Sequence, residues 1–300
     1  MEQVSDNFKA GFVAVVGKPN VGKSTLINRY LKEKISIVSS RPQTTRIRVL
    51  AILNHNNYQV IFLDTPGIHE PRNLLGKYMV KEAESSLEDA DIILVLVDAT
   101  TGIEIEDRHL LELVEGYDKK KILVVNKIDA VNKPELLPIL DEVRKLAEFD
   151  EYIPISALEG ENTDLLLQKI IELLPESPPF YPRDQLSDRP ERFHIAELIR
   201  EKILENTYEE VPHSVAVVVD EFKEREGKDL IYIKAVIYVE RSSQKKIIIG
   251  RDGRMLKKIG SEARMEIERF LGKKVFLDLW VKIYEKWRRD SRALRRLGYK

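Results

Sequence analysis

The sequence has no cysteine and no long apolar run. The absence of cysteine excludes disulfide bridges, thiol catalysis and zinc–thiolate sites. The longest apolar run, residues 92–97, is far shorter than the ~20 residues that a membrane-spanning helix needs. The first ten residues, MEQVSDNFKA, lack the basic flank and apolar stretch of a secretory signal. The lack of cysteine is compatible with a reducing cytosol but does not prove one.

The length of the chain predicts two domains. The chain has 300 residues, of which 43% are hydrophobic, and a typical domain has about 150 residues. One third of the residues are charged, yet the net charge is only −1. This composition fits a chain with two buried cores better than a disordered chain.

The net charge conceals two halves of opposite sign. Residues 1–180 contain 21 basic and 29 acidic residues, whereas residues 181–300 contain 28 and 21. The last sixty residues are more basic still, with 19 basic against 7 acidic residues. The near-neutral total is therefore no argument against a nucleic-acid partner for the second half.

Residues 1–173 alternate short apolar runs with amphipathic stretches. The apolar runs predict strands at residues 12–16, 59–63, 92–97, 121–125 and 152–155. Residues 46–53 predict one more strand, for which an antiparallel direction is one alternative. Strands that alternate with helical patterns indicate an α/β fold with a mostly parallel sheet covered by helices.

Residues 174–183, LPESPPFYPR, contain four prolines and cannot continue a helix or a central strand. We predict a linker here, between a domain of residues 1–173 and a domain of residues 184–300. The second domain is expected to be α+β. Its predicted elements are a helix at 193–205, strands at 214–222 and 230–239, a glycine-bounded turn, a helix at 255–271, a strand at 274–283 and a basic final helix.

A phosphate-binding loop follows the first predicted strand. The pattern G-x-x-x-x-G-K-S is matched by Gly17, Lys18, Pro19, Asn20, Val21, Gly22, Lys23 and Ser24, and a helical pattern begins at Thr25. Backbone N–H groups and a helix N-terminus supply partial positive charge to phosphate oxygens. We expect Lys23 to reach the β and γ phosphates and the Ser24 hydroxyl to bind Mg²⁺.

Two further motifs follow later strands. Asp64 ends the strand at 59–63, where its carboxylate can hold Mg²⁺ through water, and the Gly67 amide can sense a γ-phosphate. Asn126, Lys127 and Asp129 follow the strand at 121–125. A carboxylate at Asp129 can accept hydrogen bonds from guanine N1–H and N2–H₂, a donor pair that adenine lacks.

Other groups complete the predicted guanine site. Asn126 can contact N7 and brace the phosphate loop, and the stem of Lys127 can cover the base. Ser156, Ala157 and Leu158 follow the next strand, where the Ala157 amide would face guanine O6. Each motif lies at the carboxyl end of a strand, the edge where parallel sheets bind ligands.

With these motifs, residues 11–173 resemble the translation-factor-related class of P-loop GTPases. The segment Pro42-Gln43-Thr44-Thr45-Arg46 is similar to the first switch of the Era-type GTPases. The resemblance implies that a threonine hydroxyl binds Mg²⁺ in the GTP state. We choose Thr45, because Arg46 aligns with the arginine that follows the switch threonine in related families, and Thr44 is the alternative. Lys23, Thr45 and Gly67 are the expected catalytic residues.

Two loop residues bear on the rate of hydrolysis. Ile68 follows Gly67, where Ras-like enzymes carry a water-positioning glutamine, so slow intrinsic hydrolysis is expected. Related GTPases with asparagine at the position of Asn20 bind K⁺ beside the phosphates. The resemblance therefore suggests K⁺ as a further cofactor beside GTP, GDP and Mg²⁺. The alternative is that Asn20 only shapes the loop.

The second domain contains a G-x-x-G loop after an apolar run. Two glycines let a nucleic-acid backbone approach closely, and basic neighbours favour its phosphates. The order of helix, strands, loop, helix and strand resembles the type II KH domain, a single-stranded RNA reader. The resemblance implies RNA contacts from Ile247, Ile248, Ile249, Gly250, Arg251, Asp252, Gly253, Arg254, Lys257 and Lys258.

The predicted strand at 274–283 alternates in polarity. Phe276, Asp278, Trp280 and Lys282 share one face. The two aromatics suit base stacking, but packing under the final helix is the favoured prediction. The last fifteen residues carry seven cations, which favour an RNA-phosphate surface over anionic lipid.

Both halves, in this order, resemble the Era family. The resemblance implies a cytoplasmic, monomeric GTP-hydrolysing switch that binds the 3′ end of 16S ribosomal RNA and assists assembly of the 30S subunit. It also implies peripheral association with the inner membrane. The alternative is a membrane-associated signalling GTPase with a purely structural KH-like domain.

Overall fold

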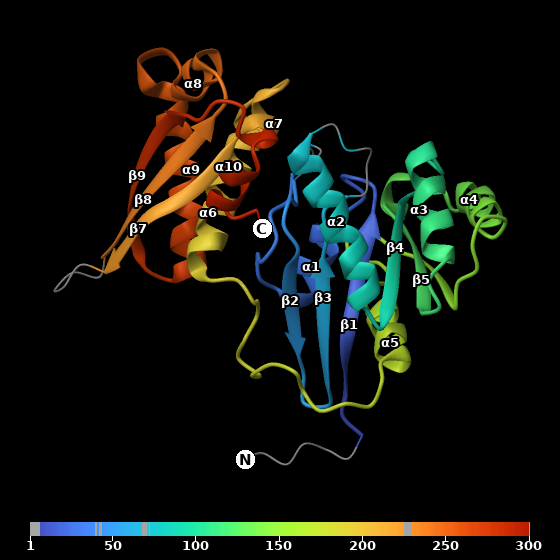
Figure 1. Cartoon of the computed structure of the whole chain (residues 1–300). Helices are drawn as coiled ribbons and strands as arrows, with labels where there is room; N and C mark the ends of the chain where they lie inside the picture. Colours follow the sequence, from blue (N-terminus) through green and yellow to red (C-terminus); the bar gives the residue numbers. More distant parts are fainter. Residues whose placement is uncertain are drawn as a thin grey trace. The chain divides into compact units, whose positions relative to one another are not determined.

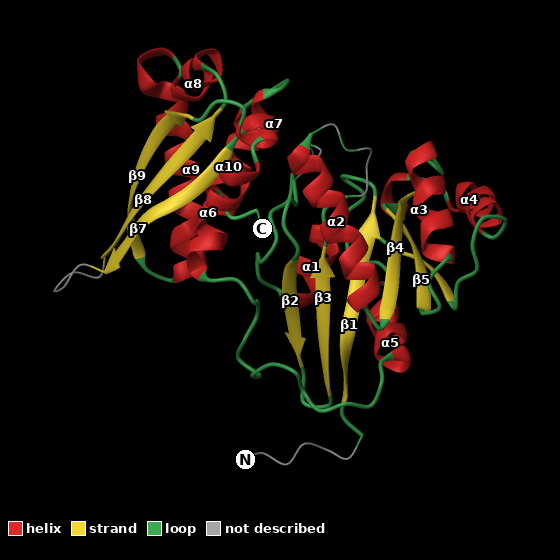
Figure 2. Cartoon of the chain, viewed as in Figure 1, coloured by secondary structure: helices red, strands yellow, loops and turns green. Residues whose placement is uncertain are grey.

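A six-stranded sheet covered by helices forms the N-terminal half of the chain (Figures 1 and 2). The computed structural model describes residues 7–39, 41, 44–67, 71, 73–224 and 230–299. The strand order is β2-β3-β1-β4-β5-β6. The elements are β1 (Lys9–Gly17), α1 (Lys23–Leu31), β2 (Val49–Asn54), β3 (Tyr58–Asp64), α2 (Leu74–Asp89), β4 (Ile92–Asp98), α3 (Ile105–Glu115), β5 (Lys120–Asn126), α4 (Leu136–Val143), β6 (Glu151–Pro154) and α5 (Thr163–Leu173).

The predicted sheet is confirmed. β1 pairs in parallel with β3 and β4, and the parallel pairing continues through β5 to β6. β2 is antiparallel to β3, so the strand predicted at residues 46–53 has the antiparallel direction. The carboxyl ends of the five parallel strands consequently share one edge of the sheet, which is where the predicted motifs lie.

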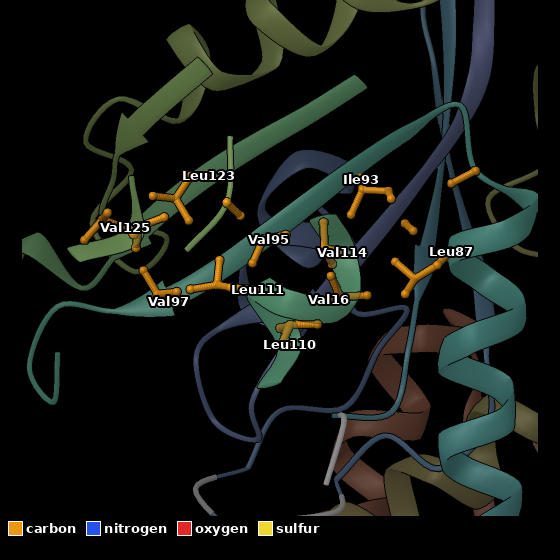
Figure 3. Packing of buried hydrophobic residues seen from close by; sticks show 14 of the residues in the cluster. Val16, Leu87, Ile93, Val95, Val97, Leu110, Leu111, Val114, Leu123 and Val125 are labelled. Carbon is orange, nitrogen blue, oxygen red and sulfur yellow. The ribbon is translucent and has the colours of Figure 1, made fainter. Parts of the chain in front are cut away.

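Apolar side chains from the central strands pack against α2 and α3 (Figure 3). Central parallel strands are buried on both faces and read as nearly continuous apolar runs, as residues 92–97 do. Burial of this layer makes the strand ends a rigid base for the loops that follow them. The labelled residues are Val16, Leu87, Ile93, Val95, Val97, Leu110, Leu111, Val114, Leu123 and Val125.

The proline-rich segment lies against the N-terminal sheet. The buried Gln59 side chain donates to the carbonyl of Tyr181 at 2.8 Å and accepts from the N–H of Phe180 at 2.8 Å. Ser187 forms an isolated bridge with Ala51 of β2. The boundary between the two compact units falls between residues 188 and 189, later than the predicted linker. Prolines prevent regular structure here, but their neighbours still offer hydrogen bonds to the sheet.

The C-terminal unit is a three-stranded sheet of order β7-β8-β9 with α6 and α9 packed on one face (Figure 2). β7 and β8 are antiparallel, whereas β8 and β9 are parallel. β8 and β9 have the predicted bounds. The elements are α6 (Glu191–Asn206), α7 (Val211–Ser214), β7 (Ala216–Glu224), β8 (Leu230–Val239), α8 (Ser242–Ile249), α9 (Arg254–Leu271), β9 (Lys274–Ile283) and α10 (Ser291–Arg296).

The isoleucine run before the G-x-x-G loop is the last turn of a helix that was not predicted, α8. The Gln244 side chain caps its start by accepting from the backbone N–H groups of Glu240 and Arg241, each at 3.0 Å. The Ile248 side chain is fully buried in the C-terminal core. The side chain of Ile248, one of the predicted RNA-contacting residues, therefore has no exposed surface to offer RNA, because helical periodicity turns this residue inward.

The aromatic residues of β9 do not pack under the final helix, so that prediction is wrong. Phe276 is 54% exposed and Trp280 is 52% exposed. Trp287 is the buried tryptophan instead: its Nε1–H donates to the carbonyl of Ser214 at 3.0 Å, and its ring stacks on Tyr299. Strand alternation shows which side chains share a face, but not whether another element covers that face.

The basic final segment is partly paired. Arg288 donates to the Glu240 carboxylate at 2.5 Å, whereas the other cations of this segment are exposed. The exposed cations are Lys286, Arg289, Arg292, Arg295 and Arg296, and Lys300 lies outside the described residues. Within the described ranges, no helix has both the length and the apolar character to cross a membrane.

Candidate functional site

The polar motifs meet at the carboxyl edge of the N-terminal sheet. The phosphate-binding loop joins β1 to α1, Asp64 ends β3, and Asn126 ends β5. Residues 156–158 follow β6. Because β1, β3, β5 and β6 run in the same direction, these loops lie side by side at one edge.

The glycine before the loop lysine has a conformation and a neighbour that exclude a side chain. Gly22 has φ 104° and caps the start of α1. A Cβ on Gly22 would lie 2.2 Å from Nδ2 of Asn126. Position 22 therefore requires glycine if the loop is to bring its backbone N–H groups close to a phosphate.

Lys23 lies inside the loop and is buried. Its Nζ donates to the carbonyls of Gly17 at 2.9 Å and Lys18 at 3.0 Å. Burial lowers the pKa of the Lys23 ammonium to about 8, although the nearby Asp64 carboxylate favours the charged form. A partly desolvated cation so placed is suited to the β and γ phosphates of a nucleotide.

Three oxygen-bearing side chains gather beside Lys23. The Ser24 hydroxyl lies 3.2 Å from Oδ2 of Asp64. The Thr45 hydroxyl lies 3.4 Å from the same carboxylate oxygen and 3.4 Å from the Ser24 hydroxyl. Thr44 does not join them, since its hydroxyl donates to the carbonyl of Arg41 at 2.6 Å.

This oxygen cluster fits Mg²⁺. Asp64 is fully buried, and its Oδ1 accepts no hydrogen bond from the part of the chain that the structure describes. Burial raises the pKa of Asp64, against the opposing effects of nearby hydroxyls and Lys23. A buried carboxylate oxygen without a donor, next to two hydroxyls, is the hard oxygen set that Mg²⁺ prefers.

Lys18 ties the phosphate loop to the start of α3. Its Nζ donates to Thr101 at 2.6 Å, Glu104 at 2.5 Å and Asp107 at 3.0 Å. Glu104 and Asp107 also form the capping box of α3. The motif pattern places Lys18 in the loop, but nothing in the sequence pattern indicates these distant partners.

The Asn126 side chain joins the phosphate loop to the loop after β6. Its Nδ2 donates to the carbonyl of Val21 at 2.7 Å, as expected for a residue that braces the phosphate loop. Its Oδ1 accepts from the Ala157 N–H at 2.9 Å. The predicted contact of the Ala157 amide with guanine O6 would compete with this hydrogen bond.

The remaining base-recognition residues lie beside Asn126. Lys127 has φ 67°, and its Nζ forms an ion pair with Asp98 at the end of β4. Asp129 is exposed and makes no hydrogen bond or ion pair with any described residue. Its carboxylate is therefore free to accept a donor pair from a base. Leu158 is exposed on the same loop as Ala157.

Part of the predicted switch region is placed by the structure. A Cβ on Gly67 would lie 3.0 Å from Pro19, so Gly67 packs against the phosphate loop. Asn20, at the predicted K⁺ position, has φ 65°. Pro42, Gln43 and Ile68 lie outside the described residues.

A groove between α9 and β9 continues from the G-x-x-G loop. Of the predicted RNA-contacting residues, it includes Gly253 and Lys257. Arg251, Asp252, Arg254 and Lys258 are exposed around the loop, while Ile249 is partly buried against the core. The residues that line the groove are Gly253, Leu256, Lys257, Gly260, Ser261, Arg264, Val275, Phe276, Leu277 and Leu279.

Sequence reasoning missed the part of α9 beyond Lys258 that lines this groove. Gly260 lies in the helix interior, and a Cβ there would lie 3.3 Å from Leu279 of β9. The Gly-Ser pair at 260–261 was the available signal, because small residues inside an amphipathic helix often mark a close approach. Gly250 also requires glycine: it has φ 72°, and its Cβ would lie 2.6 Å from the Cβ of Met255.

Known families match both halves of the chain. The family described as 50S ribosome-binding GTPase matches residues 12–127, and the KH domain family matches residues 210–288. GTPase Era of Alkaliphilus oremlandii is 49% identical over 292 residues, which cover 97% of this chain and 99% of the relative. GTPase Era of Carboxydothermus hydrogenoformans is 50% identical over 293 residues, 98% of each chain.

Solved structures of Era are similar over the same length. An Aquifex aeolicus Era variant bound to GDP and AlF₄⁻ superposes with a TM-score of 0.94 at 46% identity. The match covers 97% of this chain and 99% of the Aquifex aeolicus chain. A structure of Era with MgGDPNP and nucleotides 1506–1542 of 16S ribosomal RNA matches with the same TM-score, identity and coverage.

Proposed function

Because the chain belongs to the Era family of GTPases, we propose that it binds the 3′ end of 16S ribosomal RNA and assists assembly of the 30S subunit. The chain is a P-loop GTPase with a C-terminal KH domain and uses GTP and Mg²⁺. The observation that carries the RNA proposal is the near full-length match to an Era that was solved with this RNA.

At the nucleotide site, we propose that the loop backbone and Lys23 hold the β and γ phosphates. Ser24, Thr45 and Asp64 would hold Mg²⁺, which offsets phosphate charge when bound. The Gly67 amide would bind the γ-phosphate. Asp129 would select guanine by accepting from N1–H and N2–H₂.

At the C-terminal unit, we propose that single-stranded RNA lies in the groove between α9 and β9. Lys257 and Arg264 line one side of the groove and would face phosphates, while Leu277 and Leu279 supply an apolar surface for bases. The G-x-x-G loop would clamp the RNA backbone. The exposed Arg251 and Arg254 add positive charge at that point.

The nucleotide state would control RNA binding through the segments that flank Thr45 and Gly67, the two residues expected to respond to the γ-phosphate. Two short segments of the N-terminal half belong to the C-terminal compact unit. They are the described residues of 37–44, just before Thr45, and of 71–78, shortly after Gly67. Ordering of Thr45 and Gly67 by a γ-phosphate would thus act on chain segments that belong to the RNA-binding unit. Equal RNA affinity with GDP and with a non-hydrolysable GTP analogue would refute this coupling.

The test of RNA binding is a titration of labelled 16S 3′-end RNA with the full chain over a series of salt concentrations. We expect a preference over scrambled RNA and a steep fall in affinity with salt. Gly253→Asp is the better probe of the two loop glycines. A Cβ at Gly253 would meet no atom within 4 Å, and aspartate tolerates the φ of 74° there better than most residues do, whereas a side chain at Gly250 would collide with Met255. Gly253→Asp should abolish RNA binding and leave GTP binding intact.

Binding to anionic vesicles tests the rival function. If the chain bound vesicles but no RNA, the membrane-associated signalling GTPase would replace our proposal. Peripheral inner-membrane association, a cytoplasmic location and a monomeric state remain predictions from the family resemblance.

A further inference from the structure

Two exposed aromatic side chains lie on the outer face of β9. Phe276 and Trp280 are four residues apart and therefore share a face, about 13 Å from each other along the strand. Tyr232 of β8 stacks on Phe276, with ring centroids 5.9 Å apart and an interplanar angle of 17°. Nζ of Lys234 lies 5.9 Å from the centre of the Trp280 ring. The remaining exposure of each ring, about half, leaves a surface for another planar group.

Asp278 holds the rings of Trp280 and of Tyr232, the stacking neighbour of Phe276, in place. The Trp280 Nε1–H donates to its Oδ2 at 3.0 Å, and the Tyr232 hydroxyl donates to the same oxygen at 3.2 Å. Both rings are thus oriented before any ligand binds. Binding to oriented rings costs less conformational entropy than binding to mobile ones.

The aromatic face is continuous with the groove of the KH domain. Phe276 belongs to the groove lining together with Lys257 and Arg264. Among the described strands, β9 is an edge of its sheet, since it pairs only with β8. An RNA strand that fills the groove can therefore continue past β9 onto the outer face of the sheet.

The charge and spacing of the face suit nucleic acid better than a protein. Lys234 and the exposed Lys282 lie on the same face as the two rings. Glu221 is already paired with Lys223 at 2.6 Å and Lys234 at 3.5 Å. Two separate rings with a carboxylate between them make a poor continuous apolar patch for a protein, but they offer two sites for stacking.

We infer that Phe276 and Trp280 form a stacking platform for unpaired bases of the RNA that leaves the α9–β9 groove. This inference rests on the proposed RNA-binding function and adds a second contact site to it. Base stacking on aromatic rings tolerates any base, so the platform adds affinity for a longer strand without adding strict sequence preference.

Tryptophan fluorescence reports directly on this platform. The chain has two tryptophans, of which Trp287 is fully buried and Trp280 is half exposed. Binding of a single-stranded 16S 3′-end RNA should quench Trp280 emission and protect it from acrylamide. Trp280→Phe should remove this signal while it retains most of the affinity, because phenylalanine can still stack.

Affinity measurements with altered protein and altered RNA provide the second test. The double variant Phe276→Ala/Trp280→Ala should bind the RNA at least about tenfold more weakly, as stacking losses predict. RNA that is abasic at the positions flanking the groove segment should bind wild-type protein equally weakly, and the double variant should add no further loss. Phe180→Ala, which removes a 51% exposed ring from the N-terminal unit, should leave RNA affinity unchanged.

The outcomes separate this inference from the function on which it rests. Suppose that Gly253→Asp abolishes RNA binding, that the double variant binds RNA like wild type, and that RNA leaves the Trp280 emission of the wild-type protein unchanged. The platform is then wrong and the KH groove stands. If wild-type protein binds no RNA at all, both proposals fail.

Discussion

Asn126 occupies the space that a side chain on Gly22 would need: the Nδ2 atom lies 2.2 Å from the position of that missing Cβ. The same Nδ2 donates to the carbonyl of Val21, and the Oδ1 accepts from Ala157. A single buried amide thus connects the phosphate loop with the base-recognition loop. The geometry of the phosphate half of the site depends on the base half.

Gly22→Ala should therefore disrupt nucleotide binding. The new methyl group displaces Asn126, leaves the Val21 carbonyl unpaired and strains a residue at φ 104°. Each effect costs ~1–3 kcal/mol, so affinity for a fluorescent GDP analogue should fall at least about tenfold. Gly272→Ala is the matched control: it also has positive φ, but its Cβ would meet nothing within 4 Å. If both variants bound GDP like wild type, the role given to Asn126 would be wrong.

Thr45→Ala should reduce GTP hydrolysis more than Thr44→Ala does. Only the Thr45 hydroxyl lies near Ser24 and Asp64, whereas the Thr44 hydroxyl is bonded to Arg41. Loss of one oxygen from the Mg²⁺ set should lower the rate by about tenfold or more and shift the Mg²⁺ dependence to higher concentration. The measurement is phosphate release during a Mg²⁺ titration of each variant. A larger loss in Thr44→Ala would assign the metal-binding hydroxyl to Thr44.

Asp129→Asn should change the preferred base from guanine to xanthine. The Asp129 carboxylate is exposed and unpartnered among described residues, so the substitution should leave the fold intact. An amide presents a donor to the xanthine 2-oxo group, where the carboxylate accepted from the guanine amino group. Competition of GTP and XTP against a fluorescent GDP analogue measures the change. Asp141→Asn, an exposed carboxylate on α4, is the control and should still prefer GTP.

The parts of the site that could be predicted are those with a local signal. The phosphate loop, Asp64 and Asn126 each follow an apolar run, and parallel pairing alone brings the ends of such runs together. The tie between Lys18 and Asp107 spans 89 residues and has no local pattern, so it needed the structure. The choice of Thr45 over Thr44 rested on the family resemblance, and only atomic distances show which of the two hydroxyls lies near Asp64.

The C-terminal errors have a different origin. Isoleucines favour strands, so the run that ends α8 gave no helical signal, and only the cap formed by Gln244 shows where that helix begins. Trp280 lies in β9, and Trp287 lies in the short helical turn that follows this strand. Tertiary packing alone decides that the first is exposed and the second buried.

K⁺ bound at Asn20 should accelerate GTP hydrolysis. We expect GTP hydrolysis to be faster in KCl than in NaCl of equal ionic strength. A cation held by the Asn20 side-chain oxygen next to the phosphates would supply positive charge where an arginine finger acts in other GTPases. Asn20 has φ 65°, which asparagine tolerates better than most residues, so Asn20→Gly keeps the loop conformation while it removes the oxygen. In that variant the rates in the two salts should become equal. Equal rates already in the wild-type protein would mean that Asn20 only shapes the loop.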